Sequence, residues 1–347
     1  MPLHPILLIG GSGVVGRHAA RYLRDANPDV PILIGGRDRD KAASVAASIS
    51  NAEPLTVDLT LADLGLGDRP IGAVAVLFTD QRVAGLGFAQ TRGIPYVSIS
   101  PGINELGPEV ARFIHRPDAS AVVLGTEWLV GATSVPTLEF AKEFGRVDEI
   151  RIGALLDEED DFGPAAEADL ERQTKVMPAA LERRDGAFVW RSGDAATGSI
   201  RAVDGTELPA QALSPNDLLG LAMATGAPDV RFDLAIGLSS SRRRGEPLSA
   251  EIVIELAGTD HRGLPLRARR AVVHPGGQMP LTGLGVALLL ERLTGLDGNP
   301  PTSPGLYFPY QLLDPAAYLA RLRGISGVVL DLDADGDGAP ARAGVSA

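Results

Sequence analysis

A glycine-rich hexapeptide near the N-terminus carries the clearest chemical signal in the sequence. It follows a short apolar run at residues 6–9 and reads Gly11-Ser12-Gly13-Val14-Val15-Gly16. Gly11 would permit a tight turn, Gly13 would let the backbone approach a pyrophosphate, and Gly16 would allow a helix to pack closely on a strand. The helix that begins here would offer unpaired N–H groups to phosphate. The motif therefore predicts a dinucleotide site in which residues 11–15 contact the cofactor.

The end of the second predicted strand distinguishes NAD from NADP. An NAD site usually has an acidic residue about twenty positions after the glycine motif, whereas this sequence reads Gly35-Gly36-Arg37-Asp38. Gly36 leaves room for a 2′-phosphate, and the planar guanidinium of Arg37 can pair with that phosphate. Asp38 could serve a ribose or simply cap the next helix. The pattern favours NADP as the cofactor and leaves NAD possible.

Two further polar residues are predicted at the cofactor because they follow predicted strands. Asp58 comes after the third strand and is a candidate partner for the adenine amino group. Thr79 comes after the fourth strand, where the chain normally passes the nicotinamide ribose. In sheets of this kind, ligands bind at the carboxyl ends of the strands.

Three side chains are candidates for the proton transfer that often accompanies hydride transfer. His274 ends a predicted strand, although a structural histidine facing a loop is the alternative. Tyr96 could donate from its hydroxyl group, or could be a packing aromatic. Glu127 follows the sixth predicted strand, together with Trp128, and both are expected at the cleft between two domains.

The elements that would position these residues alternate between strands and helices over the first 128 residues. This alternation predicts an α/β fold with a doubly wound parallel sheet, a Rossmann domain at residues 1–128. The predicted strands are short apolar runs at residues 5–9, 30–34, 55–57, 73–78, 95–99 and 121–124.

Beyond residue 147 the expected strands are longer and alternate between apolar and polar residues. Such alternation is typical of a mostly antiparallel sheet with one covered face. We therefore predict an α+β domain at residues 129–330 for substrate binding and dimerisation, with residues 280–330 packing back on the first domain. Hairpin-like connections are expected at residues 242–246 and 258–263, and a disordered tail at residues 331–347.

Charge and composition limit the partners of this chain. The net charge is −12, which argues against binding to nucleic acid, and the absence of cysteine excludes disulfides and thiolate metal sites. The basic run at residues 242–244 and the acidic run at residues 157–161 are expected in solvated loops, and no metal site is expected. Without a signal-peptide pattern or a membrane-spanning run, we expect a cytoplasmic protein. A broad antiparallel sheet commonly forms a dimer face, so we also expect a homodimer. The expected partner is a small-molecule substrate.

The order of these motifs resembles the saccharopine dehydrogenase/reductase-like family of NAD(P)-binding proteins. The matching segments are the glycine motif, Gly36-Arg37, Val57-Asp58-Leu59, Gly93-Ile94-Pro95-Tyr96-Val97 and Pro304-Gly305-Leu306-Tyr307-Phe308-Pro309. The resemblance implies a Rossmann domain, a second domain with an antiparallel sheet that often dimerises, and reversible hydride transfer at a C–N centre.

The sequence departs from this family after the Tyr-Val pair. Relatives commonly carry an aspartate there, whereas this chain has Ser98, followed by Ser100 after one apolar residue. The change puts an amino-acid substrate in doubt, and we take Ser98, Ser100 and Trp128 as candidate substrate contacts.

Three functions fit these observations. The first is an NADP(H)-dependent oxidoreductase acting on an imine, an amine or a related carbonyl, with a cleft that is polar at its nicotinamide end. The second is an NADP(H)-binding redox sensor without turnover. The third is an enoyl-type C=C reductase, whose apolar cleft would be lined by Trp128, Leu129 and Met279.

Overall fold

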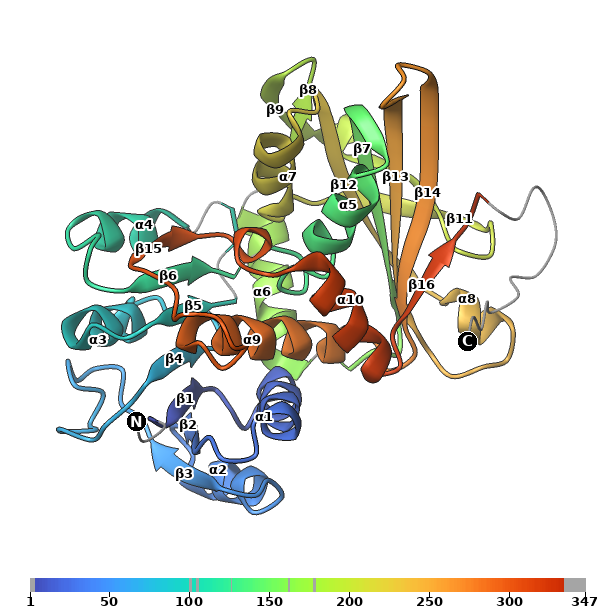
Figure 1. Ribbon diagram of the computed structural model, residues 1–347. Coiled ribbons are helices and arrows are strands. Elements are labelled where there is room, and N and C mark those ends of the chain that lie inside the picture. Colours follow the sequence, from blue (N-terminus) through green and yellow to red (C-terminus); the bar gives the residue numbers. More distant parts are fainter. Residues whose placement is uncertain are drawn as a thin grey trace.

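The computed structural model describes residues 4–99, 102–103, 106–125, 127–161, 163–176 and 179–333. The predicted disordered tail, apart from residues 331–333, lies outside the described residues. A parallel seven-stranded sheet has the order β15-β6-β5-β4-β1-β2-β3 (Figure 1). Its strands are β1 (Ile6–Ile9), β2 (Ile32–Gly36), β3 (Ala52–Thr56), β4 (Ala73–Val76), β5 (Tyr96–Ser98), β6 (Ala121–Leu124) and β15 (Gly305–Tyr307).

The short strands of this sheet are apolar because helices cover both of its faces. In β1, Ile6 and Leu8 face the core that contains α1 (Val14–Ala26), α2 (Arg39–Ala46) and α9 (Met279–Thr294). Leu7 and Ile9 face the opposite core, with α3 (Ala84–Arg92) and α4 (Leu106–Ile114). The predicted doubly wound sheet is confirmed.

The second sheet is mixed and has nine strands. Its main path is β10-β11-β12-β7-β13-β14-β16, and β8 and β9 are attached beside β12. Pairing is antiparallel except between β7 and β12. The strands are β7 (Phe144–Asp157), β8 (Ala179–Arg184), β9 (Ala187–Ser192), β10 (Thr197–Arg201), β11 (Glu207–Ala212), β12 (Asp229–Gly237), β13 (Ala250–Asp260), β14 (Pro265–His274) and β16 (Val328–Asp331).

One face of this second sheet packs on helices and shares its core with the first domain. Ile150 and Ile152 of β7 lie in the same buried cluster as residues of α1 and α9. The helices on this side are α5 (Ser134–Ala141), α7 (Asp217–Thr225) and α10 (Pro315–Gly324) (Figure 1). Within the described part of the chain, no helix is both long and apolar enough to cross a membrane.

One of the two expected hairpins is present and the other is not. β13 and β14 form an antiparallel hairpin that turns at residues 260–264, which confirms the second prediction. The hairpin expected at residues 242–246 is wrong, because β12 and β13 lie on opposite sides of β7 and do not pair with each other. The connection between them contains the short helix α8 (Ser240–Arg243).

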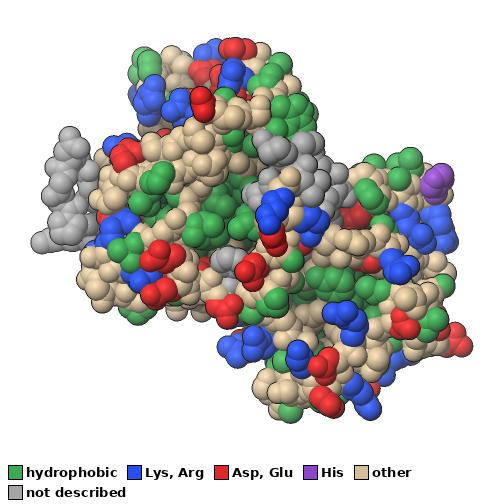
Figure 2. All heavy atoms as spheres, turned by 180° about the vertical axis from the view of Figure 1, so that it is seen from behind, with side chains coloured by type: hydrophobic (Ala, Val, Ile, Leu, Met, Phe, Trp, Pro, Cys, Tyr) green, Lys and Arg blue, Asp and Glu red, His purple; other side chains and the backbone are tan. Residues whose placement is uncertain are grey.

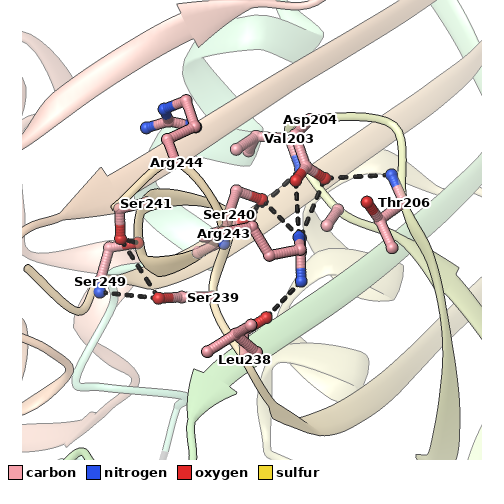
Figure 3. Close-up of polar contacts among 12 residues, drawn as sticks. Val203, Asp204, Thr206, Leu238, Ser239, Ser240, Ser241, Arg243, Arg244 and Ser249 are labelled. Atoms are coloured by element: carbon pink, nitrogen blue, oxygen red, sulfur yellow. Dashed lines mark hydrogen bonds and ion pairs between the residues drawn. The ribbon is translucent and has the colours of Figure 1, made fainter. Parts of the chain in front are cut away.

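The prediction that the basic and acidic runs lie in solvated loops is partly wrong, because residues of both runs pair with other charged side chains. Arg242 Nη1 lies 2.7 Å from Oδ1 of Asp157, whose side chain is fully buried. Although burial opposes ionisation, hydrogen bonds from Ser239 and Arg242 help to lower the pKa of Asp157 to about 2. Arg243 donates two hydrogen bonds to Asp204, of 2.6 and 2.9 Å (Figure 3). These ion pairs fix the crossover against the second sheet.

The C-terminal segment connects both sheets. α9 packs beside α1, and β15 extends the parallel sheet next to β6. β16 then pairs with β14 in the second sheet. Glycines allow α9 to approach its neighbours closely: a Cβ on Gly283 would lie 2.5 Å from Cβ of His18.

We expect Gly283→Ala to destabilise the protein, because the added methyl group would overlap with α1. Overpacking of this kind costs about 1–3 kcal/mol, which urea unfolding can measure. Gly107→Ala is a matched control in α4, since a Cβ there meets no atom within 4 Å. Alanine favours a helix over glycine by up to ~1 kcal/mol, so the control should be unchanged or slightly more stable. Equal stability of the two variants would contradict the close packing of α9 on α1.

Candidate active site

A cavity of about 470 Å³ lies between the glycine-rich turn and the second domain. In the space-filling view, apolar side chains gather in the hollowed middle of one face, between two lobes of the molecule (Figure 2). The cavity walls come from the turn after β1, the loops after β5 and β6, and the first residues of α9. The start of α6 (Gly163–Val176), the end of β7 and the segment before α7 also contribute, together with Lys41 and Leu77.

The glycine-rich turn leaves the start of α1 open to this cavity. Gly10 has the left-handed conformation, with φ +87°, so the tight turn assigned to Gly11 belongs to the preceding residue. Gly11 instead lets α1 approach, since a Cβ on Gly16 would lie 2.5 Å from the Gly11 Cα. The N-cap residue Gly13 has no side-chain cap, and the first turn of α1 contains no acidic residue. The first N–H groups of α1 can therefore bind an anion.

The residues after β2 form the predicted adenosine end of the site. Gly36 faces the turn, because a Cβ there would lie 4.0 Å from Oγ of Ser12. Asp38 caps α2 by accepting from the backbone N–H groups of Asp40 and Lys41, at 3.1 and 3.0 Å. Its carboxylate is thus used for capping. Arg37 is exposed beside it.

Two cations that the sequence interpretation missed, Arg17 and Lys41, line the cavity. Arg17 directly follows Gly16 of the glycine motif, so its position gave a signal that was not used, whereas Lys41 lies within α2, away from the motif and from any strand end. Asp58 is exposed and accepts hydrogen bonds from the side chain and backbone of Thr60, at 2.6 and 2.8 Å. It is not among the described residues that line the cavity.

Thr79 connects the end of β4 to α6. Its hydroxyl group donates to Oδ1 of Asp169 at 2.9 Å and accepts from Nη2 of Arg172 at 2.8 Å. At its other end, α6 begins over the turn, where a Cβ on Gly163 would lie 3.1 Å from Cγ2 of Val14. α6, which follows β7 in the chain, therefore packs on the parallel-sheet part of the molecule at two points and forms one wall of the cavity. The polar sequence of this helix gave no apolar periodicity by which to predict it.

Tyr96 and Ser98 belong to a buried network behind the sheet. The Tyr96 hydroxyl donates to Oε1 of Glu109 at 3.0 Å, and the Ser98 hydroxyl donates to Oε2 at 2.9 Å. Burial raises the pKa of Tyr96 well above its usual value and also raises the pKa of Glu109. These contacts hold α4 against β5, which favours a structural role for both residues. Ser100 lies outside the described residues.

Both ring nitrogens of His274 form hydrogen bonds with the backbone. Its Nδ1 accepts from the backbone N–H of Gly276 at 3.0 Å, so its Nε2 carries the proton and donates to the Ile325 carbonyl at 2.8 Å. Burial lowers the pKa of His274. The ring is not part of the described cavity wall, and the geometry favours the structural histidine over the catalytic one.

Glu127 and Trp128 both line the cavity, at the position expected for them. Glu127 is 2% exposed and accepts from the hydroxyl of Ser134. The backbone N–H of Trp128 donates to Oδ2 of Asp217 at 2.5 Å. Asp217 is fully buried at the start of α7, and the sequence interpretation missed it, because an acid at a helix start resembles an ordinary helix-start residue.

The two carboxyl groups are protonated more readily than usual. Burial raises the pKa of Asp217 to about 7. Burial, together with the nearby Asp217, raises the pKa of Glu127 well above its usual value. No ion pair with Lys, Arg or His reaches either group within the described residues. Glu127 lines the cavity, so the cavity wall carries a carboxyl group that holds its proton more tightly than usual, with Asp217 buried behind it.

Comparison with known proteins identifies the fold. No protein-family model and no curated protein matches the chain. Saccharopine dehydrogenase (L-Glu forming) from Saccharomyces cerevisiae matches with a TM-score of 0.62 and 15% identity, over 94% of this chain and 100% of that one. Homospermidine synthase from Legionella pneumophila, solved in complex with NAD, matches with a TM-score of 0.62 and 10% identity, over 100% of this chain and 96% of that one. The predicted resemblance is confirmed at the level of the fold.

We expect Asp217→Asn to make the protein more stable at alkaline pH. A folded-state pKa of about 7, above the usual 3.8, means that the folded chain holds this proton more tightly than the unfolded chain. Ionisation of Asp217 therefore lowers stability as the pH rises from about 4 through about 7. In urea unfolding, the variant should match the parent near pH 4 and exceed it by ~1–3 kcal/mol at pH 8.

The exposed Asp118 provides the control for this measurement. Asp118→Asn should give the same difference from the parent at both pH values. The same result for Asp217→Asn would contradict the interpretation of Asp217 as a carboxyl group that ionises unfavourably.

Proposed function

We propose that the protein is an NADP(H)-dependent oxidoreductase that transfers hydride to or from the C–N bond of an imine, an amine or a related carbonyl compound. The observation that carries this proposal is that one continuous cavity connects the uncapped start of α1 with the Glu127 carboxyl group. One end fits a dinucleotide phosphate and the other holds a proton. Cytoplasmic localisation, homodimerisation and the absence of nucleic-acid partners stay predictions.

The residues of the glycine-rich turn fit a dinucleotide. The first-turn N–H groups of α1 would hold the pyrophosphate, and no side chain of the described residues caps them. Gly36 leaves space beside Ser12. Lys41 in the cavity wall and Arg37, which is exposed and outside the described wall, would supply positive charge for a 2′-phosphate. Asp38 caps α2, which weakens its case as a ribose ligand. The NAD in the Legionella structure supports a nicotinamide cofactor in this fold.

Glu127 is the proposed proton donor and acceptor. A bound nicotinamide ring would supply or accept the hydride. Reduction of a C=N bond also requires a proton on nitrogen, and oxidation of an amine requires a group that takes the proton away. Glu127 lies in the cavity wall, its pKa is raised by burial, and Ser134 fixes its orientation.

An apolar cavity wall favours a second candidate, a C=C reductase. Trp128, Leu129 and Met279 all line the cavity, as that function requires. The cavity also continues beyond the glycine-rich turn to these residues, and space for a second ligand favours an enzyme over a redox sensor. The buried acid in the same wall favours C–N chemistry on a substrate with an apolar body.

Fluorescence titration with NADPH and NADH tests the cofactor assignment. Arg37→Ala should weaken NADPH about tenfold, since a charge-assisted contact contributes about 1.4 kcal/mol or more, and should leave NADH unchanged. Arg262→Ala, at the exposed tip of the β13–β14 hairpin, is the matched control and should change neither affinity. Equal NADPH affinity in the parent and Arg37→Ala would overturn the 2′-phosphate assignment. Failure of both dinucleotides to bind would overturn the proposed function.

A further inference from the structure

Buried polar atoms without hydrogen-bond partners cluster in two loops beside the cavity. They are Oε1 of Glu127, Nε1 of Trp128, Oδ1 and Nδ2 of Asn216, and Oδ1 of Asp217. Buried polar groups in proteins are nearly always paired, so each such atom calls for a partner that the protein itself does not supply. Five of them within residues 127–128 and 216–217 indicate a site that a polar ligand or water completes.

The charge of this cluster selects the kind of ligand. Glu127 and Asp217 are both acidic, and no cation of the described residues neutralises them. A bound cation favours the ionised form of these carboxyl groups and a bound anion opposes it, above all when burial reduces the screening by water. The indole ring of Trp128 also lines the cavity and provides an aromatic surface, which further favours a cation.

The rest of the cavity limits the shape of this cation. Beyond the acidic end, the wall is formed by apolar side chains, which include Leu77, Ile99, Leu156, Leu213 and Met279. A metal ion or a small inorganic cation would leave this apolar surface unused. An organic ligand with a charged nitrogen at one end and an aliphatic body fits both parts of the cavity.

We propose that the Glu127–Asp217 pair, beside Trp128, is the subsite that binds the protonated amine group of an aliphatic substrate. This inference rests on the proposed function and specifies its substrate class. An ammonium group donates up to three hydrogen bonds, and Glu127, which lines the cavity, can accept one of them. Asp217 lies buried behind Glu127 and Trp128 and contributes its charge rather than a direct contact. A substrate with a carboxylate next to that nitrogen is disfavoured, because the carboxylate would be repelled by the same pair.

The two tryptophans of the chain allow a direct binding assay. Trp190 is half exposed on β9, whereas Trp128 lines the cavity. In a Trp190→Phe background, Trp128 is therefore the only tryptophan, and its fluorescence reports on the cavity. Hexylamine, hexanol and hexanoate serve as probes of equal chain length at pH 7.5, without cofactor. Hexylamine should produce a saturable change at a concentration at least about tenfold lower than either of the other probes.

Isosteric variants then assign the effect to the pair. Glu127→Gln and Asp217→Asn should each weaken hexylamine about tenfold or more and change hexanol little. Glu109→Gln is the matched control, since Glu109 is a buried carboxyl group that bonds Tyr96 and Ser98 and contacts neither Glu127 nor Trp128, and it should bind hexylamine like the parent. Selectivity among the three probes in the Trp190→Phe protein needs no change at the pair, so it tests the proposal even where a variant fails to fold.

The outcomes separate this inference from the proposed function. Hexanoate or hexanol binding as tightly as hexylamine would overturn the subsite, and so would unchanged hexylamine affinity in folded Glu127→Gln and Asp217→Asn. If NADPH binds and hexylamine does not, the amine subsite fails and the cofactor assignment stands. If hexylamine binding depends on the pair while neither dinucleotide binds, the proposed function fails and the amine subsite stands.

Discussion

The close contact between Gly11 and Gly16 sets the position of α1, and the rest of the site depends on it. A side chain at Gly16 would collide with the backbone of Gly11, so only glycine lets the helix begin directly over the end of β1. α1 in turn receives α9 at Gly283, and a Cβ at Gly285 of α9 would lie 2.2 Å from the carbonyl oxygen of Val130. This series of close backbone approaches connects the glycine-rich turn to the loop that carries the acidic end of the cavity.

The buried carboxyl groups of the protein differ in whether a cation stabilises their charge. Asp157 is fully buried, but an arginine and several hydrogen-bond donors stabilise its charge. Glu127 and Asp217 are equally buried and lack such a cation among the described residues. Uncompensated buried acids are costly to a fold and are often found where a protein acts on a ligand. The contrast within one molecule separates a buried acid whose charge the fold stabilises from two buried acids whose charge it does not.

Much of the first domain could be predicted because its signals are local. The apolar runs that became β4 and β6 and the glycine turn follow from residue type and spacing alone. The faces of β5 illustrate the limit: Tyr96 and Ser98 point toward α4, whereas Ile99, the next residue, lines the cavity. Successive side chains of a strand alternate between faces, so an assignment displaced by one residue places a side chain in the wrong layer.

Long-range pairing explains what the sequence did not reveal. The parallel pairing of β7 with β12 depends on a connection of some seventy residues, which no local pattern encodes. The ion pair of Arg242 with Asp157 and the contact of Asp217 with Trp128 join segments more than eighty positions apart. Neither contact can be predicted from local runs of charge, because its two partners come together only through the folding of distant segments.

The return of α9 and β15 to the first domain has a consequence for biosynthesis. A ribosome releases the glycine-rich turn first, yet α1 gains its α9 neighbour only after residue 294 has emerged, and β6 gains its β15 neighbour only after residue 307. Until then, one edge of the parallel sheet and an apolar face of α1 stay uncovered, the kind of surface on which nascent chains aggregate. The parallel sheet that carries the glycine-rich turn is thus the first part to be translated and among the last to be complete.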